Sequence, residues 1–589
     1  DPAQLWHLPL PYPDPAFDHQ YRMCADVTYA PVAAHGLVFI PSNVADQVLA
    51  CVLKTGRTVW RYITDGPVRM APACIGDTVC FGSDDGCLYA VAARTGELRW
   101  KVHGAPDHLP DSRLLVNGRL CSRWPVRGAP VIHGDAVFFG AGVWPEEGVY
   151  VSAVDVRTGE LLWRSDKLSY IKNGMSDHGQ AYDLSLPPQG YPAVLDGKLA
   201  VTSGRSLAAW FDLETGAMEP YTCFYVKTSP PRGTWFVAGT GGYWFQGGHW
   251  FGTRPDSALP LPEALKDAKS PLYWSRDNHA NERYVMKERP FLGGDAIGGF
   301  GSENYYSEPV LTETTAYASE FASERKYFVP RGHTHVSFPT YDRIVARDLA
   351  NPTWTSETQI HVRYNRQKVK MPRLVFPIQW ELECPLKVLA KGGNRLYAGG
   401  KDTVAAIHIP SPGETPKIVW QRSVSGTPVN ALIADETLVV TTHTGHVYAF
   451  GAGDPQPSPV ASTTPEPGPY ASPRGGFALL LGWGDGQRAK QLATDEDCRV
   501  VVFEADPTIA AEARNRLAEQ GLYGRRIQVL NASIRDLHLT PHWANRLVIN
   551  DLDSHGLDEE VLSAALDTLR PFTGRLELRS DDRQRVVLE

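Results

Sequence analysis

The sequence has no apolar run long enough to cross a membrane as a helix, so it predicts no transmembrane helix. It also has no excess of positive charge. Lys and Arg number 58 against 66 Asp and Glu, and the resulting net charge of −8 argues against a general nucleic-acid-binding protein. The nine cysteines form no CxxC or CxxCH pattern, and their odd number disfavours a complete disulfide framework. For Cys80 and Cys87 we expect buried thiols, with a disulfide as the alternative.

No secretory signal peptide is recognisable in the first residues, which read Asp1-Pro2-Ala3-Gln4-Leu5-Trp6. This start is compatible with a processed N-terminus and with a cytosolic protein. The composition is that of a globular protein, with 43% hydrophobic and 21% charged residues, and 53 Gly and 46 Pro for turns. A length of 589 residues predicts two or more domains.

A short pattern recurs in the first part of the chain: an apolar strand, a Thr-Gly turn, and a tryptophan five residues after the threonine. Full copies begin at Thr55, Thr95 and Thr158, and a copy without the tryptophan begins at Thr215. A spacing of about 40 residues, with one turn and one aromatic residue per unit, is typical of β-propeller blades. Because a blade cannot bury both faces alone, we expect the tryptophan to fill the space between neighbouring blades.

Eight hairpin-like segments predict an all-β propeller of about eight blades over residues 1–452. Each has an apolar strand, a small polar turn that supplies positive φ, and a second apolar strand. They begin at Pro31, Pro72, Pro130, Pro192, Trp235, Pro309, Lys387 and Asn430. The fifth and sixth match least well, so seven blades are the alternative. Trp6 is expected to add an outer strand to the last blade; the alternative is that it packs on the surface.

After a Pro/Ser/Thr-rich linker at 453–473, residues 474–589 alternate between strands and helices. A Gly-rich turn follows the first strand, and this order predicts an α/β, Rossmann-like domain with a parallel sheet. The glycines would let a nucleotide-type ligand approach the backbone, and an acid after the second strand can accept hydrogen bonds from ribose hydroxyls. The predicted cofactor-binding residues are Gly482, Gly484, Asp485, Gly486 and Glu504.

One residue of each expected blade lies three positions before its hairpin, and together these residues should form a ring around the propeller axis. They are Thr28, Arg69, Arg127, Gln189, Arg232, Tyr306, Cys384 and Thr427. The three arginines, with Gln189, predict a funnel that binds an anionic small molecule or saccharide. The alternative is that the arginines pair with carboxylates or are simply solvated.

Two long insertions carry the candidate catalytic residues. His178 and Tyr182 lie in the insertion at 166–188, and Tyr306 lies near the end of the second insertion, at about 247–307. If they meet above the arginines, they could act as general acid and base; the alternative is that they are surface residues. No metal site is predicted, because the pair His333 and His335 has no identifiable third ligand.

The repeats at 28–163 and 386–450 resemble PQQ-like (quinoprotein-type) propeller repeats. The resemblance is carried by the Thr-Gly-x-x-x-Trp pattern and by the Asp-Gly-x-Leu-Tyr-Ala pattern at 85–90. Such repeats occur in quinoprotein alcohol dehydrogenases and in the propeller lipoprotein of the outer-membrane assembly machine. The sequence has neither an adjacent Cys-Cys pair nor a clear set of calcium ligands, so PQQ remains an alternative cofactor that no specific residue supports.

Residues 477–579 resemble a class I S-adenosylmethionine-dependent methyltransferase. The three glycines of the turn match its first motif, and Glu504 matches the acid that holds the ribose. Two acids of that family are replaced, one by Leu480 and one by Ala532-Ser533, and only Arg585–Glu589 remain for its final strand pair. The resemblance implies S-adenosylmethionine as a cofactor. The departures imply a truncated, inactive domain, or a chain that continues.

The combination resembles multidomain proteins of planctomycete-type bacteria. PQQ-like propellers usually work outside the cytoplasm, whereas S-adenosylmethionine is a cytosolic metabolite. We therefore expect a periplasmic or secreted binding or assembly scaffold for a protein partner, with a degenerate methyltransferase-like domain and with a cytoplasmic location as the alternative. One alternative function is an enzyme, quinoprotein-like or carbohydrate-active, with an anionic ligand in the funnel. The other is an active methyltransferase.

Overall fold

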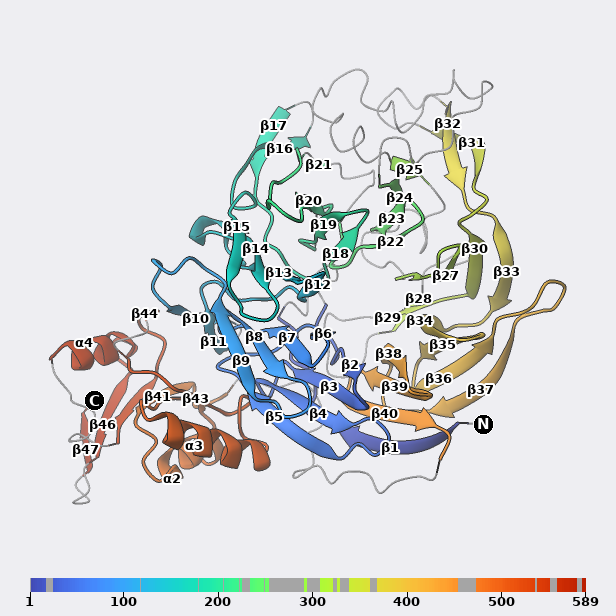
Figure 1. The fold of residues 1–589 in the computed structure, drawn as a ribbon. Coiled ribbons are helices and arrows are strands. Elements are labelled where there is room, and N and C mark those ends of the chain that lie inside the picture. The colour runs from blue at the N-terminus through green and yellow to red at the C-terminus, as the bar shows by residue number, and fades with distance from the viewer. Residues whose placement is uncertain are drawn as a thin grey trace.

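The computed structural model consists of a ring of β-sheets and a smaller α/β sheet beside it (Figure 1). It describes residues 2–16, 25–116, 118–177, 180–204, 206–221, 223–224, 233–247, 249–253, 291–293, 308–320, 326–328, 338–360, 368–453, 473–534, 538–550, 559–579 and 585–588. Within these residues, no helix is both long and apolar enough to cross a bilayer. Cys80 and Cys87 are free thiols, as expected.

In the part of the chain that the structure describes, eight antiparallel sheets form the blades of the ring, so the structure has the propeller predicted from the repeats. Blades one to four contain β2 (Val32–Ala34), β3 (Leu37–Ser42), β4 (Gln47–Val52) and β5 (Thr58–Ile63); β6 (Ala73–Ile75), β7 (Thr78–Gly82), β8 (Cys87–Ala92) and β9 (Leu98–His103); β12 (Val131–His133), β13 (Ala136–Ala141), β14 (Tyr150–Asp155) and β15 (Leu161–Ser165); and β18 (Ala193–Leu195), β19 (Lys198–Val201) and β20 (Ala209–Asp212).

Blades five to eight continue around the ring and end with the strand from the N-terminus. They contain β22 (Ala238–Thr240), β23 (Tyr243–Gln246), β24 (His249–Gly252) and β25 (Phe291–Gly293); β26 (Val310–Leu311), β27 (Thr315–Glu320), β30 (Arg343–Asp348) and β33 (Ile378–Glu383); β34 (Lys387–Gly392), β35 (Arg395–Gly400), β36 (Thr403–His408) and β37 (Lys417–Ser423); and β38 (Pro428–Ala434), β39 (Thr437–Thr442), β40 (His446–Gly451) and β1 (Ala3–Pro9).

Shorter elements lie between and around the blades. They are β10 (Ser112–Val116), β11 (Arg119–Ser122), the 3₁₀ turn η1 (Pro145–Glu147), β16 (Ile171–Asp177), β17 (Gln180–Leu184), β21 (Cys223–Phe224), β28 (Lys326–Phe328), β29 (Phe338–Thr340), β31 (Thr353–Ile360) and β32 (Lys368–Val375). Strands β17, β16 and β21 form one sheet at the rim of the ring, and β10–β11 is a hairpin between blades two and three.

The repeated tryptophans join neighbouring blades. The indole N–H of Trp60 donates to the carbonyl of Ala93 at 2.9 Å, and that of Trp100 donates to Val156 at 3.0 Å. Each acceptor lies just before the Thr-Gly turn of the next blade, and the glycine leaves room for the ring. A Cβ on Gly96 would lie 2.7 Å from the Trp60 ring. The Thr-Gly…Trp pattern is therefore the contact between blades.

The ring closes through the N-terminal strand, as predicted from Trp6. Strand β1 pairs antiparallel with β40, and the Trp6 side chain is 1% exposed. Its indole donates to the carbonyl of Leu53 in blade one at 2.8 Å. On the other side of blade eight, Trp420 donates to the carbonyl of Pro2 at 3.2 Å. Blade eight thus takes the same kind of tryptophan contact that joins blades one and two and blades two and three, although its strands come from both ends of the ring sequence.

The second sheet contains β43, β42, β41, β45, β46 and β47 in that spatial order; the first five strands are parallel, and β47 is antiparallel. Its elements are β41 (Phe477–Leu481), α2 (Gln487–Thr494), β42 (Arg499–Phe503), α3 (Pro507–Glu519), β43 (Ile527–Leu530), β44 (His538–Leu539), β45 (Arg546–Ile549), α4 (Glu559–Asp567), β46 (Arg575–Arg579) and β47 (Arg585–Leu588). The residues after Arg579 thus add one antiparallel strand.

Candidate functional site

The structure brings three of the four predicted funnel residues together near the propeller axis. Arg69 lies between β5 and β6, Arg127 lies between β11 and β12, and Gln189 precedes β18. All three are buried and line one small cavity with Asp26 and Trp235. The shared offset from each hairpin therefore identified residues that do converge.

Both arginines in this cavity are paired with carboxylates. Asp84, in the turn between β7 and β8, accepts from Arg69 Nε at 2.7 Å and from Arg127 Nε and Nη2 at 2.9 and 3.0 Å. Asp26 accepts from Arg69 Nη1 at 2.7 Å. Burial favours the protonated form of Asp84, but the charges of Arg127 and Arg69 outweigh burial and lower its pKa below the ordinary value. Two positive and two negative groups therefore balance at the axis.

The space left at this point is very small. The cavity measures about 10 Å³, and the described apolar residues Ala25, Met70 and Ala129 pack at the same place, with Tyr191 and Trp235 against them. Ligand pockets usually have about 300–1,000 Å³. The described residues thus leave no room here for a quinone or a sugar, and they do not fit PQQ.

The other candidate residues do not join this cluster within the described part of the chain. Tyr182 lies on β17 in the rim sheet, is 42% exposed, and does not line the axial cavity. His178, Tyr306 and Arg232 lie outside the described residues, as do His333 and His335. Their catalytic and ligand-binding roles stay predictions.

In the second sheet, the Gly-rich turn follows β41 as predicted. Gly482, Gly484 and Gly486 have φ values of 83°, 59° and 75°, which favour glycine. A Cβ on Gly486 would lie 2.2 Å from the ring of Trp483, which is buried in the core beneath the turn. Asp485 accepts a hydrogen bond from the Gln487 amide at 2.9 Å and so holds the start of α2.

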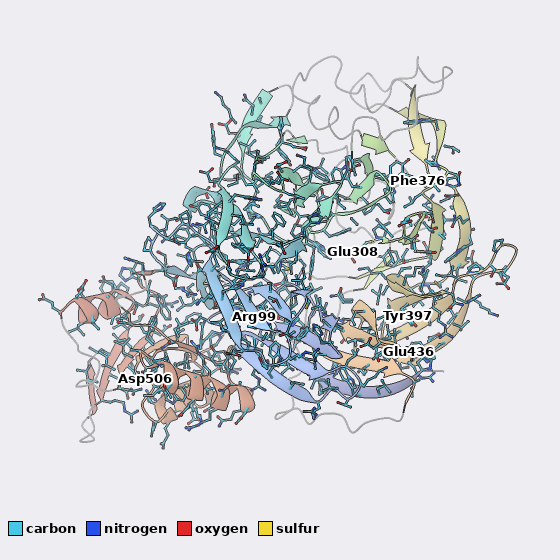
Figure 2. All side chains as sticks on the ribbon, in the orientation of Figure 1. Arg99, Glu308, Phe376, Tyr397, Glu436 and Asp506 are labelled. Carbon is cyan, nitrogen blue, oxygen red and sulfur yellow. The ribbon has the colours of Figure 1, made fainter. Side chains whose placement is uncertain are left out.

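Glu504, the predicted ribose-binding acid, is 6% exposed and is bonded to its own chain. One carboxylate oxygen accepts from the Trp483 amide at 2.9 Å, and the other accepts from the Asp506 amide at 3.0 Å. Asp506 is labelled in Figure 2 beside the α/β sheet. The Asn550 side chain donates to the Gly482 carbonyl at 2.8 Å across the end of the sheet. These contacts tie the strand ends to one another.

These residues do not fit S-adenosylmethionine well enough to form its site. Leu480, which replaces an acid of the methyltransferase motif, is fully buried in the core, and Ala532-Ser533 offers no carboxylate for the adenine. The one remaining acid is engaged by two backbone amides. What the turn and Glu504 do in this structure is join β41, β42 and α2.

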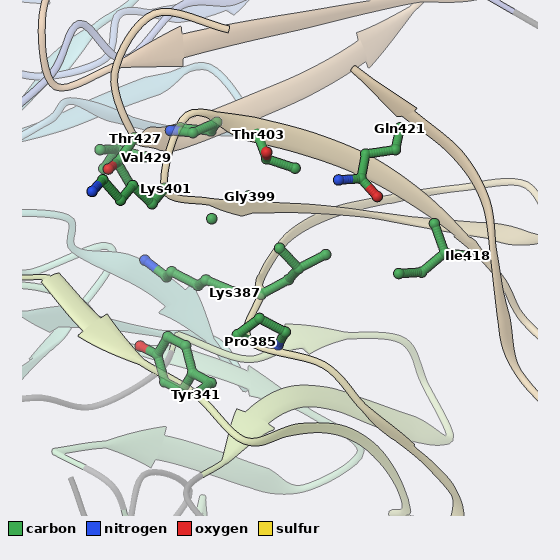
Figure 3. A pocket seen from close by; sticks show the side chains of 13 residues that line it. Tyr341, Pro385, Lys387, Gly399, Lys401, Thr403, Ile418, Gln421, Thr427 and Val429 are labelled. Atoms are coloured by element: carbon green, nitrogen blue, oxygen red, sulfur yellow. The ribbon is translucent and has the colours of Figure 1, made fainter. Parts of the chain in front are cut away.

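The sequence analysis did not single out a larger cavity between blades six, seven and eight (Figure 3). It measures about 450 Å³ and is lined by Tyr341, Pro385, Leu386, Lys387, Gly399, Gly400, Lys401, Thr403, Ile418, Gln421, Thr427, Pro428 and Val429. Figure 3 shows the amino groups of Lys387 and Lys401 extending toward the same side. Lys387 pairs with Glu308 at 2.5 Å, and Figure 2 labels Glu308 near the centre of the ring. Two of its lining residues had been named from the sequence, Thr427 in the predicted ring and Lys387 at the start of the seventh hairpin, but neither was linked to a cavity.

Comparison with known proteins bears on the repeats. Residues 2–142 match the family described as "Outer membrane protein assembly factor BamB". The dehydrogenase subunit of the quinone alcohol dehydrogenase of Gluconobacter oxydans (strain 621H) is 31% identical over 175 residues, which are 28% of this chain and 22% of that protein. Quinohemoprotein alcohol dehydrogenase ADH-IIG of Pseudomonas putida is 28% identical over 229 residues, 35% and 27% of the two chains.

This chain therefore spans about a quarter of the length of these curated relatives. Among solved structures, BamB from Moraxella catarrhalis aligns with a TM-score of 0.41 and 13% identity, over 77% of this chain and 100% of that one. The family and sequence matches identify the propeller repeats as PQQ-like, related to those of BamB and of quinoprotein alcohol dehydrogenases.

Proposed function

We propose that this protein is a periplasmic or secreted binding or assembly scaffold with a PQQ-like propeller at residues 1–452. In this proposal a linker at 453–473 connects it to a Rossmann-like, methyltransferase-type domain at 474–589 that has lost its chemistry. The observation that carries the proposal is the closed axis: Asp84 and Asp26 neutralise Arg69 and Arg127 in a cavity of about 10 Å³.

The second support is that the residues of the Gly-rich turn make structural contacts. Its glycines and Glu504 serve contacts within the sheet, and the acids expected at positions 480 and 533 are Leu and Ser. A third support is that the matching family is described as an assembly factor. A scaffold with a protein partner is consistent with all three, whereas either enzyme would need a site that the described residues do not form.

A binding experiment separates the scaffold from both enzymes. The purified chain is titrated by calorimetry with PQQ plus Ca²⁺ and, separately, with S-adenosylmethionine. We expect no saturable binding of either compound. Micromolar binding of PQQ that is lost in Arg69→Gln would overturn the scaffold in favour of the axial enzyme. Micromolar binding of S-adenosylmethionine that is lost in Glu504→Gln would favour the methyltransferase.

A second experiment looks for the partner. Photo-crosslinking residues are placed in the native host at Lys401, in the turn between β35 and β36, and at Glu436, in the turn between β38 and β39. These exposed turns lie at opposite ends of the blade strands. A scaffold should give a discrete adduct with one protein from one of the two faces. Absence of an adduct at both positions would count against a partner bound at either of these turns.

The axial cluster makes a separate prediction about stability. Asp84→Ala leaves two buried guanidiniums without their shared carboxylate, and we expect a loss of about 3–5 kcal/mol in the free energy of unfolding. Asp77→Ala is the matched control in the same blade, because its partner Arg99, labelled in Figure 2, is well exposed. Its expected cost is below about 1 kcal/mol. Urea unfolding measures both, and equal effects would show that the axial cluster is not structural.

A further inference from the structure

The parallel sheet has two faces, and the helices cover them unequally. Helices α2 and α3 pack on one face through Ala489, Leu492, Ala513 and Leu517. On the other face the chain supplies α4, through Val561 and Ala565. The connection from β43 to β45 forms no helix in its described residues, 531–534 and 538–545. Parallel sheets are stable when both faces are covered, so this half of the second face needs another cover.

The hairpin β10–β11 of the propeller lies on that face. Leu120 of β11 is 1% exposed and belongs to the same core cluster as Val501, Phe503 and Leu530 of the sheet. Leu115, opposite Leu120 in the hairpin, packs against the cluster as well. The core of the α/β sheet therefore contains side chains from a segment more than 350 residues earlier in the chain.

Backbone contacts hold the hairpin to the sheet at both ends. Strand β10 pairs in parallel with β44, Ser112 opposite His538 and Arg113 opposite Leu539. At the tip, the carbonyl of Gly118 accepts from Arg499 Nη1 at 2.6 Å. The hairpin and β44 form one three-stranded sheet, so the β43–β45 connection, which forms no helix in its described residues, is itself paired with the hairpin.

A second contact joins blade one to the edge of the α/β sheet. Asp65 forms an ion pair with Arg514 of α3, and its carbonyl accepts from the Gln528 side chain at 2.7 Å. The Tyr523 hydroxyl, buried between the two units, donates to the Thr64 carbonyl at 3.1 Å. These groups are largely buried, so the contact between blade one and the α/β sheet excludes water at its centre.

We propose that the β10–β11 hairpin takes the place of a crossover helix in the α/β domain, so that the propeller surface formed by residues 64–65, 112–116 and 118–122 has this domain as its permanent, obligate partner. Residues 474–588 are then not a separable module. The proposal rests on the packing of described side chains and is independent of which ligand or partner the propeller binds.

The test cuts the chain between the two units without removing either. A site for a sequence-specific protease is inserted in the full chain between Thr463 and Thr464, in the linker. After cleavage, we expect the two fragments to elute together at the volume of the uncut protein on size-exclusion chromatography. Separation of the wild-type fragments at micromolar concentration would overturn the proposal.

Variants of the hairpin then show whether its side chains hold the two fragments together. Leu120→Asp should abolish co-elution, since it places a charge in the shared core. The milder Leu120→Ala should raise amide hydrogen exchange in β42 and β43 at least about tenfold. Leu114→Ala, on the opposite face of β10, is the matched control and should leave that exchange unchanged. Protection of β13 reports that the propeller is still folded. Equal loss of protection in both units, or equal effects of the two alanine variants, would overturn the proposal.

Discussion

The last blade of the propeller and the parallel sheet are each completed by a segment from far away in the chain, but in different ways. Blade eight takes β1, which adds one strand through backbone hydrogen bonds and repeats the tryptophan contact that joins blades one to four. The parallel sheet takes the β10–β11 hairpin, which covers a face mainly with side chains such as Leu120. The first is an addition to an edge, and the second is an addition to a core.

This difference shows which kind of completion a sequence can reveal. A missing strand in a repeat can be recognised, because the other copies show that it should carry a tryptophan. Trp6 is that tryptophan. A sheet face that lacks a helix cannot be recognised in this way, because the α/β domain has no repeat with which to compare it. The cleavage and exchange experiment on Leu120 tests the core addition, and changes at Trp6, Asp65 and His446 test the closure of the ring and the contact beside the hairpin.

Removing the closing tryptophan should have the largest effect. Trp6 is 1% exposed and contacts blade one, so Trp6→Ala should lower the free energy of unfolding by about 3–5 kcal/mol. Gln4→Ala, on the same strand but exposed, is the control and should change it by less than about 0.5 kcal/mol. Denaturant unfolding measures both. A Trp6 effect as small as that of Gln4 would mean that β1 does not close the ring.

Breaking the polar contact beside the hairpin should have a smaller effect. Asp65→Ala leaves the largely buried Arg514 without its carboxylate, and we expect a loss of about 1–3 kcal/mol. Asp135→Ala, at an exposed turn of blade three, is the control. The loss should appear as faster hydrogen exchange in α3 rather than in β6. Faster exchange confined to the propeller would show that Asp65 supports blade one alone.

Acidification should destabilise the pairing of β1 with β40 but not the packing of the β10–β11 hairpin on the α/β sheet. His7 of β1 and His446 of β40 approach to 2.7 Å between ring nitrogens, and His7 stacks on Tyr448. Burial, and then the neighbouring His7, lower the pKa of His446 from 6.5 to about 4, and burial also lowers the pKa of His7. Both rings are therefore neutral in the folded protein at neutral pH.

The sign of the pH effect follows from these directions. Between about pH 6.5 and about pH 4 the unfolded chain binds protons that the folded chain does not, so stability falls as the pH is lowered through this window. Because the rings are partly exposed, the loss should be about 1 kcal/mol. Urea midpoints of wild type and His446→Gln at pH 7 and pH 5 measure it. A pH dependence that is the same in both proteins would exclude this pair as its origin.

The sequence predicts the propeller well because each Thr-Gly…Trp repeat contains the residues that form the contact between blades. Gly96 and Gly159 are needed where the tryptophan of the preceding blade stacks, and Thr215-Gly216 keeps the glycine for the same reason, although its own tryptophan is absent. The convergence of Arg69, Arg127 and Gln189 was also predictable from their common offset. Positions equivalent in a repeat lie at one level of the ring, and this needs no knowledge of side-chain packing.

The chemistry of the axis could not be predicted in the same way. Asp84 lies in a turn outside the aligned hairpins, so nothing in the repeat placed it between Arg69 and Arg127. Nor could the spacing show that the carboxylate of Glu504 accepts two backbone amides. The hairpin itself had a signal, the Asn117-Gly118 pair between two short apolar segments, 114–116 and 120–121, but its neighbours Val501 and Phe503 are far away in sequence.

The pairing of β1 with β40 has a consequence for the order of events during synthesis. Strand β1 leaves the ribosome long before its partner does, because residues 446–451 follow it by more than 400 positions. Until then blade eight does not exist, and β1 is an unpaired edge open to other chains. In a circular permutant that begins at the Thr-Gly turn of another blade, β1 would no longer be made long before its partner, and a strand of that other blade would be unpaired instead. Its refolding yield would then report how much protection β1 requires before β40 is made.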